Sequence, residues 1–140
     1  MNKQIIGSII VACTWISTGC AQNIKLAKVF AEAEKQTGIM LQEIPKATTT
    51  GNDQFSPRSL QSNGDLKLVA SRDWTSGFFP GVLWFLNEYT GKEQWKSQAQ
   101  AFTAKMEREK TNGVTHDMGF KIYCSYGTGY RLTNDPAYRD

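Results

Sequence analysis

Hydrophobic and polar positions divide the chain into helices of two kinds. Residues 23–36 place apolar side chains at i, i+3, i+4 and i+7, which predicts an amphipathic helix that Gly38 ends. Residues 77–89, GFFPGVLWFLNEY, are apolar nearly all round and predict a helix buried on all sides. Residues 92–110 again have one apolar face and predict an outer helix with a solvated side. Residues 119–129 return to a mostly apolar pattern.

The remaining segments carry weaker signals. Residues 42–65 are rich in Thr, Ser, Gly, Asn and Pro, which predicts a long loop. Residues 66–70, LKLVA, alternate in polarity and indicate a short strand or an extended approach to the next helix. Asn134-Asp135-Pro136 predicts the start of a further helix.

The two apolar segments are related by a repeat of about forty residues. Gly77-Phe78 recurs as Gly119-Phe120, and Trp95 recurs as Tyr138. Each unit consists of a loop, an inner helix, a short turn and an outer helix. Stacked units of this kind bury a continuous core. The pattern therefore predicts an all-α ring of helical hairpins, in which the loops before the inner helices open on one end.

Composition and charge exclude several classes of protein. Apolar residues make up 40% and charged residues 21%, as in soluble globular proteins, and 140 residues allow one domain. The net charge is +3 and no block of five or more basic residues occurs, so a nucleic-acid partner is not expected. The sequence shows no zinc, phosphate-loop or cofactor motif, so we expect neither a metal nor a cofactor.

Residues 1–20 have the layout of a secretory signal peptide. Lys3 precedes an apolar run over residues 5–16, which is shorter than the ~20 residues that span a bilayer, and small residues follow. Cleavage before Cys20 would create a lipid-modified cysteine, as in bacterial lipoproteins, whereas cleavage after Ala21 would release a soluble protein. We expect residues 21–140 to form the folded part of an exported protein, in the periplasm or on the outer membrane of a Gram-negative bacterium. A lipid anchor is then its only expected contact with a membrane.

The residues with candidate chemistry lie in the loops before the inner helices, at residues 72–76 (RDWTS) and 115–118 (THDM). Asp73 and Asp117 stand where a carboxylate can accept helix N–H groups and favour the positive helix end. A pair of carboxylates can also do acid–base work on sugars. The residues alone leave both interpretations open.

Other side chains near these loops also have two interpretations. Trp74 could offer a flat face to a sugar ring or could belong to the core. Arg72, Lys121 and Arg131 could meet an anionic substrate, since guanidinium matches a carboxylate in bidentate fashion, or could be solvated surface charges. An anionic sugar is therefore one candidate ligand.

Two motifs and their spacing give a more specific indication. DWTSGFFPGVLWFLNEYTG followed by THDMGFKIYCSYGTGYRLT resembles glycoside hydrolase family 88, the unsaturated glucuronyl hydrolases, over about residues 57–140. The resemblance implies an (α/α)6 toroid, of which this chain supplies the N-terminal helical hairpins. It also implies the substrate, which is an oligosaccharide made by a polysaccharide lyase with a 4,5-unsaturated uronic acid at its non-reducing end. Water is added across the C4=C5 double bond, and the unstable hydrate opens and releases the remaining sugar.

The resemblance also implies roles for individual residues. The family motif HDxGF matches His116 to Phe120, so Asp117 is expected to be a catalytic carboxylate and His116 its neighbour in the substrate site. Trp74 matches an aromatic residue that lines the sugar subsite. The family's second aspartate, a general acid/base, lies beyond Asp140, so we expect this chain to be a fragment that is inactive alone. Alternatives are a fragment of an unsaturated rhamnogalacturonyl hydrolase, or a non-catalytic helical lipoprotein that binds glycans.

Overall fold

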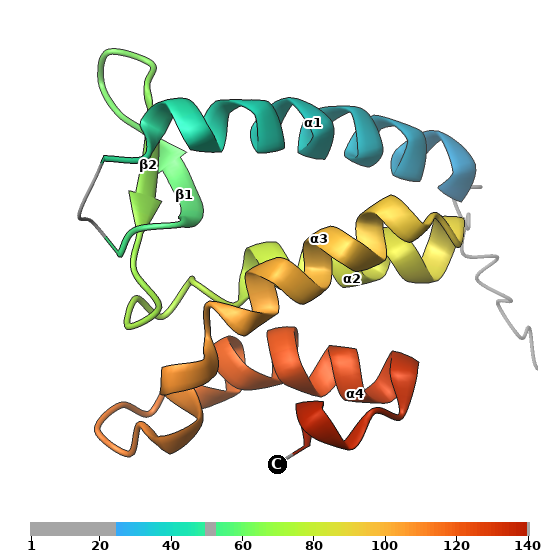
Figure 1. Cartoon of the computed structure of the whole chain (residues 1–140). Coiled ribbons are helices and arrows are strands. Elements are labelled where there is room, and N and C mark those ends of the chain that lie inside the picture. Colours follow the sequence, from blue (N-terminus) through green and yellow to red (C-terminus); the bar gives the residue numbers. More distant parts are fainter. Residues whose placement is uncertain (1–24, 50–52, 140) are drawn as a thin grey trace, which may run out of the picture.

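The structure, a computed structural model, describes residues 25–49 and 53–139 and is mostly helical (Figure 1). The predicted signal peptide and Cys20 lie outside the described residues. The α-helices are α1 (Leu26–Ala47), α2 (Phe78–Thr90), α3 (Glu93–Ala104) and α4 (Thr128–Thr133). Shorter helical segments are the 3-10 helices η1 (Glu107–Thr111) and η3 (Pro136–Tyr138) and the π-helix η2 (Gly119–Gly127). A two-stranded antiparallel sheet contains β1 (Ser56–Leu60) and β2 (Leu66–Val69).

Helix α1 is longer than its sequence pattern predicts. It continues through Gly38 and includes Pro45 in its last turn, so the predicted end at Gly38 is wrong. A glycine inside a helix costs only about 1 kcal/mol. Met40, Leu41 and Ile44 lie beyond Gly38 and pack on the core, so tertiary burial outweighs this local preference.

The segment after α1 also differs in part from its prediction. Residues 66–70 were expected to be a strand or an extended segment, and β2 confirms the strand. The long loop predicted over residues 42–65 contains the end of α1 and all of β1. The strand β1 has the sequence SPRSL, without alternating hydrophobicity, and it is defined by its ladder with β2 rather than by its own pattern.

Helices α2 and α3 form the helical hairpin that the repeat predicts, lying side by side in Figure 1. Gly91 joins them in the left-handed conformation, with φ at 67°. The indole of Trp84 is fully buried and donates a hydrogen bond of 3.0 Å to the hydroxyl of Thr103. The buried face of α3 confirms the amphipathic prediction, with Trp95, Ala99, Phe102 and, just beyond the helix, Met106. The predicted extent of this helix, residues 92–110, is wrong, because α3 ends at Ala104 and η1 follows as a separate 3-10 helix.

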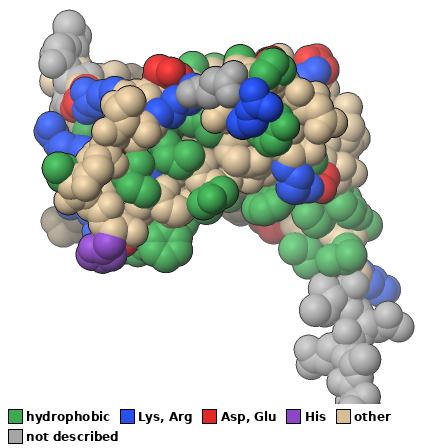
Figure 2. Space-filling view, turned by 90° about the horizontal axis from the view of Figure 1, so that it is seen from below, with side chains coloured by type: hydrophobic (Ala, Val, Ile, Leu, Met, Phe, Trp, Pro, Cys, Tyr) green, Lys and Arg blue, Asp and Glu red, His purple; other side chains and the backbone are tan. Residues whose placement is uncertain are grey.

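The prediction that α2 is buried on all sides is wrong for the described part of the chain. One face is exposed, and it carries Phe78, Val82, Phe85 and Tyr89. Their spacing of four, three and four residues makes a continuous stripe along the helix. Hydrophobic side chains also appear on the face of the molecule that Figure 2 shows. The residues that the structure describes therefore bury part of the apolar surface of α2 and leave the rest exposed.

The apolar residues 119–129 form η2 and the start of α4, rather than one α-helix. The side chain of Thr128 donates to the carbonyl of Tyr123 at 3.0 Å, five residues back, within this widened helical stretch. Long π-helical stretches are rare and often occur at functional sites. The predicted helix start at Asn134-Asp135-Pro136 is confirmed as η3, where Asp135 accepts the backbone N–H of Ala137.

Glycines allow α2 to approach η2 closely. A Cβ atom on Gly77 would lie 2.3 Å from the carbonyl oxygen of Phe120 and 2.4 Å from that of Lys121. A Cβ atom on Gly81 would lie 3.0 Å from the carbonyl oxygen of Cys124. The two backbones are therefore in direct contact on this side. In the described part of the chain, no helix is both long and apolar enough to cross a bilayer.

Candidate active site

The first loop, residues 71–77, leads into α2 and uses its carboxylate to hold itself together. Asp73 accepts hydrogen bonds from the backbone N–H and the hydroxyl of Thr75, at 2.9 and 2.7 Å, and from the guanidinium of Arg58 at 2.7 Å. Burial acts to raise the pKa of Asp73, but these hydrogen bonds and the charge of Arg58 hold it below its usual value. Asp73 is therefore ionised, and both of its carboxylate oxygens already accept hydrogen bonds from within the chain.

The second loop, residues 115–118, leads into η2 and leaves its carboxylate more open. The hydroxyl of Thr115 accepts the backbone N–H of Asp117 and lies 3.4 Å from its carboxylate. The imidazole of His116 lies 3.5 Å from the same carboxylate and is 95% exposed, whereas the Asp117 side chain is 24% exposed. An ionised carboxylate can accept about four hydrogen bonds, so Asp117 keeps acceptor capacity for a ligand.

Of the two interpretations of these aspartates, the one in which their side chains cap the inner helices is wrong. The residue before α2 is Gly77 and the residue before η2 is Met118, and neither helix has a side-chain cap. Asp117 instead supplies its backbone carbonyl, which accepts the N–H of Phe120 at 3.1 Å. The carboxylate of Asp117 is thereby left outside the helix, beside His116.

Three aromatic rings connect the two loops. Trp74, Phe78 and Phe120 contact one another edge to face, with ring centroids 5.7 to 6.0 Å apart. All three side chains are partly exposed, so Trp74 is not a core residue. Phe78 and Phe120 were not predicted as site residues, although their equivalence in the repeat was a signal that could have found them. An exposed aromatic cluster beside a carboxylate can stack on a sugar ring.

Two of the three basic residues near the loops are paired with glutamates. Lys121 is buried and paired with Glu109, with 3.0 Å between Nζ and Oε2, so it does not reach a ligand and that interpretation is wrong. Arg131 makes a bidentate pair with Glu88, at 2.7 Å for both contacts. Arg72 is exposed in the first loop, and its role towards an anion stays a prediction.

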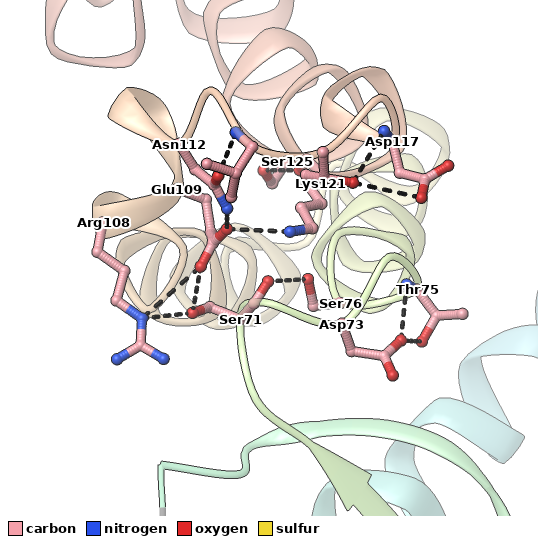
Figure 3. A network of polar contacts seen from close by, with 12 residues as sticks. Ser71, Asp73, Thr75, Ser76, Arg108, Glu109, Asn112, Asp117, Lys121 and Ser125 are labelled. Carbon is pink, nitrogen blue, oxygen red and sulfur yellow. Dashed lines mark hydrogen bonds and ion pairs between the residues drawn. The ribbon is translucent and has the colours of Figure 1, made fainter.

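Behind the two loops lies a buried polar network, which Figure 3 shows. Glu109 accepts hydrogen bonds from Ser71 at 2.8 Å, Asn112 at 2.7 Å and Lys121 at 3.0 Å. Burial acts to raise the pKa of Glu109, but the hydrogen bonds from Asn112, Ser71 and Lys121 hold it below its usual value. Glu109 is therefore an anion, and both of its carboxylate oxygens accept hydrogen bonds from these residues.

Among the residues that the structure describes, no group of three or more His, Cys, Asp and Glu side chains could hold a metal ion.

Known proteins resemble this chain in sequence. No family model matches it. The unsaturated glucuronyl hydrolase of Formosa agariphila is 37% identical over 142 residues, which cover 99% of this chain and 35% of that protein. The unsaturated glucuronyl hydrolase of Bacillus sp. GL1 is 40% identical over 84 residues, which cover 56% of this chain and 22% of that protein. The chain thus spans about a third of the length of the first of these relatives and less of the second.

The fold of this chain resembles parts of solved structures. An unsaturated glucuronyl hydrolase specific for heparin superposes with a TM-score of 0.60 at 38% identity, over 76% of this chain and 29% of its own. The Bacillus sp. GL1 enzyme superposes with a TM-score of 0.59 at 29% identity, over 79% of this chain and 29% of its own. The fold is therefore part of an (α/α)6 toroid, and the small sheet β1–β2 adds to the predicted all-α architecture. By sequence and by fold, the chain corresponds to about a third of an unsaturated glucuronyl hydrolase, which confirms the resemblance to glycoside hydrolase family 88.

Proposed function

We propose that the protein containing this chain hydrates the C4=C5 double bond of a terminal unsaturated uronic acid on glycosaminoglycan-type oligosaccharides. The observation that carries the proposal is the open carboxylate of Asp117, whose backbone carbonyl accepts the N–H of Phe120, a member of the exposed aromatic cluster with Trp74 and Phe78. Addition of a proton at C4 and a hydroxyl at C5 gives a hydrate that opens and releases the remaining sugar. The 38% identical structure with specificity for heparin supports this class of substrate.

Three residues receive roles in this proposal. Asp117 acts at the double bond, where it accepts a hydrogen bond or a proton from the reacting groups. His116 lies beside that carboxylate and is exposed enough to donate to the sugar. Trp74 stacks on the ring at the rim of the site. These contacts bring one carboxylate, one imidazole and one aromatic face to the same sugar.

We propose that a second carboxylate, outside these 140 residues, completes the reaction. Asp73 is the other aspartate in the two loops, but Arg58 and Thr75 occupy it. A group that protonates a carbon and activates water needs lone pairs that face the substrate. The chain alone is therefore expected to be inactive, and the activity belongs to a longer product.

We also propose export, on the basis of residues 1–22 alone. Cleavage before Cys20 would attach the protein to a membrane by a lipid, and cleavage after Ala21 would release it. Labelling of growing cells with a radioactive fatty acid distinguishes the two. Incorporation that the Cys20→Ser variant loses supports the lipoprotein, and no incorporation in the unaltered protein rules it out.

The activity is tested on the product of the complete reading frame that contains this chain. Unsaturated disaccharides from heparin and chondroitin are expected to lose the ultraviolet absorbance of their conjugated double bond, while saturated disaccharides stay intact. Asp117→Asn is expected to lower kcat by about 10²-fold or more. Full activity of that variant, or equal cleavage of saturated sugars, would overturn the proposal. Binding of these sugars without turnover would favour a glycan-binding protein instead.

A further inference from the structure

We propose that the buried pair of Glu109 and Lys121 positions the two loops, so that Trp74 and Asp117 are held in one arrangement. Glu109 and Lys121 are then positioning residues, because neither side chain reaches the surface: they are 4% and 1% exposed. The inference concerns the geometry of the loops. Only its consequence for catalysis rests on the proposed function.

The first structural connection joins Lys121 to Asp117. The backbone N–H of Lys121 donates to the carbonyl of Asp117 at 3.3 Å, in the first turn of η2. The ammonium group of the same residue is fixed by Glu109 at 3.0 Å. The start of the π-helix is therefore tied at both the backbone and the side chain of Lys121, one turn after Asp117.

The second step leads from Glu109 to the first loop. The hydroxyl of Ser71 donates to Glu109 at 2.8 Å and accepts from the guanidinium of Arg108 at 2.6 Å. The hydroxyl of Ser76 donates to the carbonyl of Ser71 at 2.7 Å, and Ser56 donates to the carbonyl of Ser76 at 3.0 Å. Both ends of the loop that carries Asp73 and Trp74 are thus bonded to the network (Figure 3).

The third step is direct contact between the two loops. Gly77 closes the first loop, and its backbone lies against the carbonyl oxygens of Phe120 and Lys121. A shift of Lys121 therefore moves Gly77 and the ring contacts of Trp74 with Phe120. The network and the glycine contact therefore hold the same two segments.

The charged nature of the pair supports a positioning role over a purely stabilising one. An apolar pair of similar volume is often as stable as a buried ion pair or more stable, because the ions lose their hydration. Every buried side-chain nitrogen and oxygen in the described part of the chain has a hydrogen-bond partner. A fully satisfied polar network favours one arrangement over its alternatives, because most displacements break a bond.

The test measures the surroundings of each tryptophan by fluorine NMR of the full chain labelled with 5-fluorotryptophan. The variants are Lys121→Met and Glu109→Gln, and Trp74→Phe assigns the Trp74 resonance. Trp84 and Trp95 report on the core. Glu88→Gln is the matched control, because it breaks an exposed ion pair with Arg131 by the same chemical change.

In Lys121→Met and Glu109→Gln we expect the Trp74 resonance to shift or broaden while those of Trp84 and Trp95 keep their positions. Glu88→Gln is expected to leave all resonances in place. If either variant fails to fold, Ser71→Ala tests the same connection, because it removes only the hydroxyl between Glu109 and the first loop. An unmoved Trp74 resonance in the folded variants would overturn the inference.

The catalytic consequence is measured separately in the product of the complete reading frame. Misplacement of Asp117 by a fraction of an ångström to 1 Å is expected to lower kcat about tenfold to hundredfold in Lys121→Met. An unaltered protein without activity would count against the proposed function and leave the NMR result intact. A shifted Trp74 resonance with unchanged kcat would overturn the catalytic part of the inference.

Discussion

The two loops before α2 and η2 occupy equivalent positions in the sequence repeat, yet their aspartates are used differently. Asp73 is bonded to Thr75 and Arg58 at 2.7 to 2.9 Å. Within residues 25–49 and 53–139, the carboxylate of Asp117 has a 3.4 Å contact with Thr115 and a 3.5 Å contact with the exposed His116. A repeated scaffold can therefore use one copy of a side chain for structure and leave the other for chemistry.

The difference extends to the rest of each loop. The first loop contains the buried hydroxyls of Ser71 and Ser76, which bind backbone and side-chain groups. The approach to the second loop passes through the exposed Gly113 and Val114, the latter 94% exposed. Segments with few buried contacts open at lower free energy than buried ones. We therefore expect the second loop to be the more mobile of the two.

The largest expected effect on stability comes from breaking the anchor that the two loops share. Lys121→Met removes the nearer of the two cations that face the buried Glu109 and leaves Arg108 at 3.7 Å. Loss of the buried partner is expected to lower the free energy of unfolding by up to about 3–5 kcal/mol. The double variant Glu109→Gln with Lys121→Met removes both charges and is expected to recover part of that loss. Urea unfolding measures both. A loss below ~1 kcal/mol in Lys121→Met would show that the pair does not anchor the loops.

A smaller effect is expected where the loops touch. Gly77→Ala would place a methyl group 2.3 Å from the carbonyl oxygen of Phe120, so one backbone must move. Such overpacking typically costs about 1–3 kcal/mol. Gly113→Ala is the matched control, because no atom lies within 4 Å of its Cβ position, and it is expected to change stability by less than about 0.5 kcal/mol. Equal stability of the two variants would contradict the close contact.

The smallest expected effect is on the pH dependence of stability. The pKa of Asp73 is lower in the folded chain than its usual value of 3.8, because the hydrogen bonds of Thr75 and Arg58 outweigh burial. Its contribution is fully present above that value and is lost as the pH falls through the folded-state pKa. Asp73→Asn should therefore flatten the fall in unfolding free energy below about pH 4. A slope identical to that of the unaltered chain would show that Asp73 is not held as an anion.

Sequence periodicity correctly predicted features that depend on the spacing of residues along one helix. It failed for elements whose extent depends on contacts between residues far apart in the sequence. The buried face of α3 follows from spacing along one helix, and Pro136 marks the start of η3 by local sequence alone. The continuation of α1 through Gly38 depends on packing against segments far along the chain. The strand β1 has no strand pattern and depends on β2.

The candidate site shows the same division. Asp117, His116 and Trp74 were found from motifs. The structure places His116 beside Asp117 in the second loop and Trp74 in the first loop, which contacts Phe120 just after the second. Their roles stay predictions. The burial of Lys121 could not be predicted, because its partner Glu109 lies on a separate 3-10 helix and the pattern of a lone lysine resembles a surface charge. Phe78 and Phe120 could have been predicted as site residues, because they occupy equivalent positions in the repeat.

The division of roles between the two aspartates is tested most directly by comparing Asp117→Asn with Asp73→Asn in the product of the complete reading frame. Turnover of an unsaturated disaccharide and urea unfolding are measured for both. We expect Asp117→Asn to lose about 10²-fold or more in kcat with nearly unchanged stability. We expect Asp73→Asn to lose about 1–2 kcal/mol of stability, with a much smaller loss of kcat. Full turnover in Asp117→Asn, or the reverse pattern between the two variants, would contradict the account.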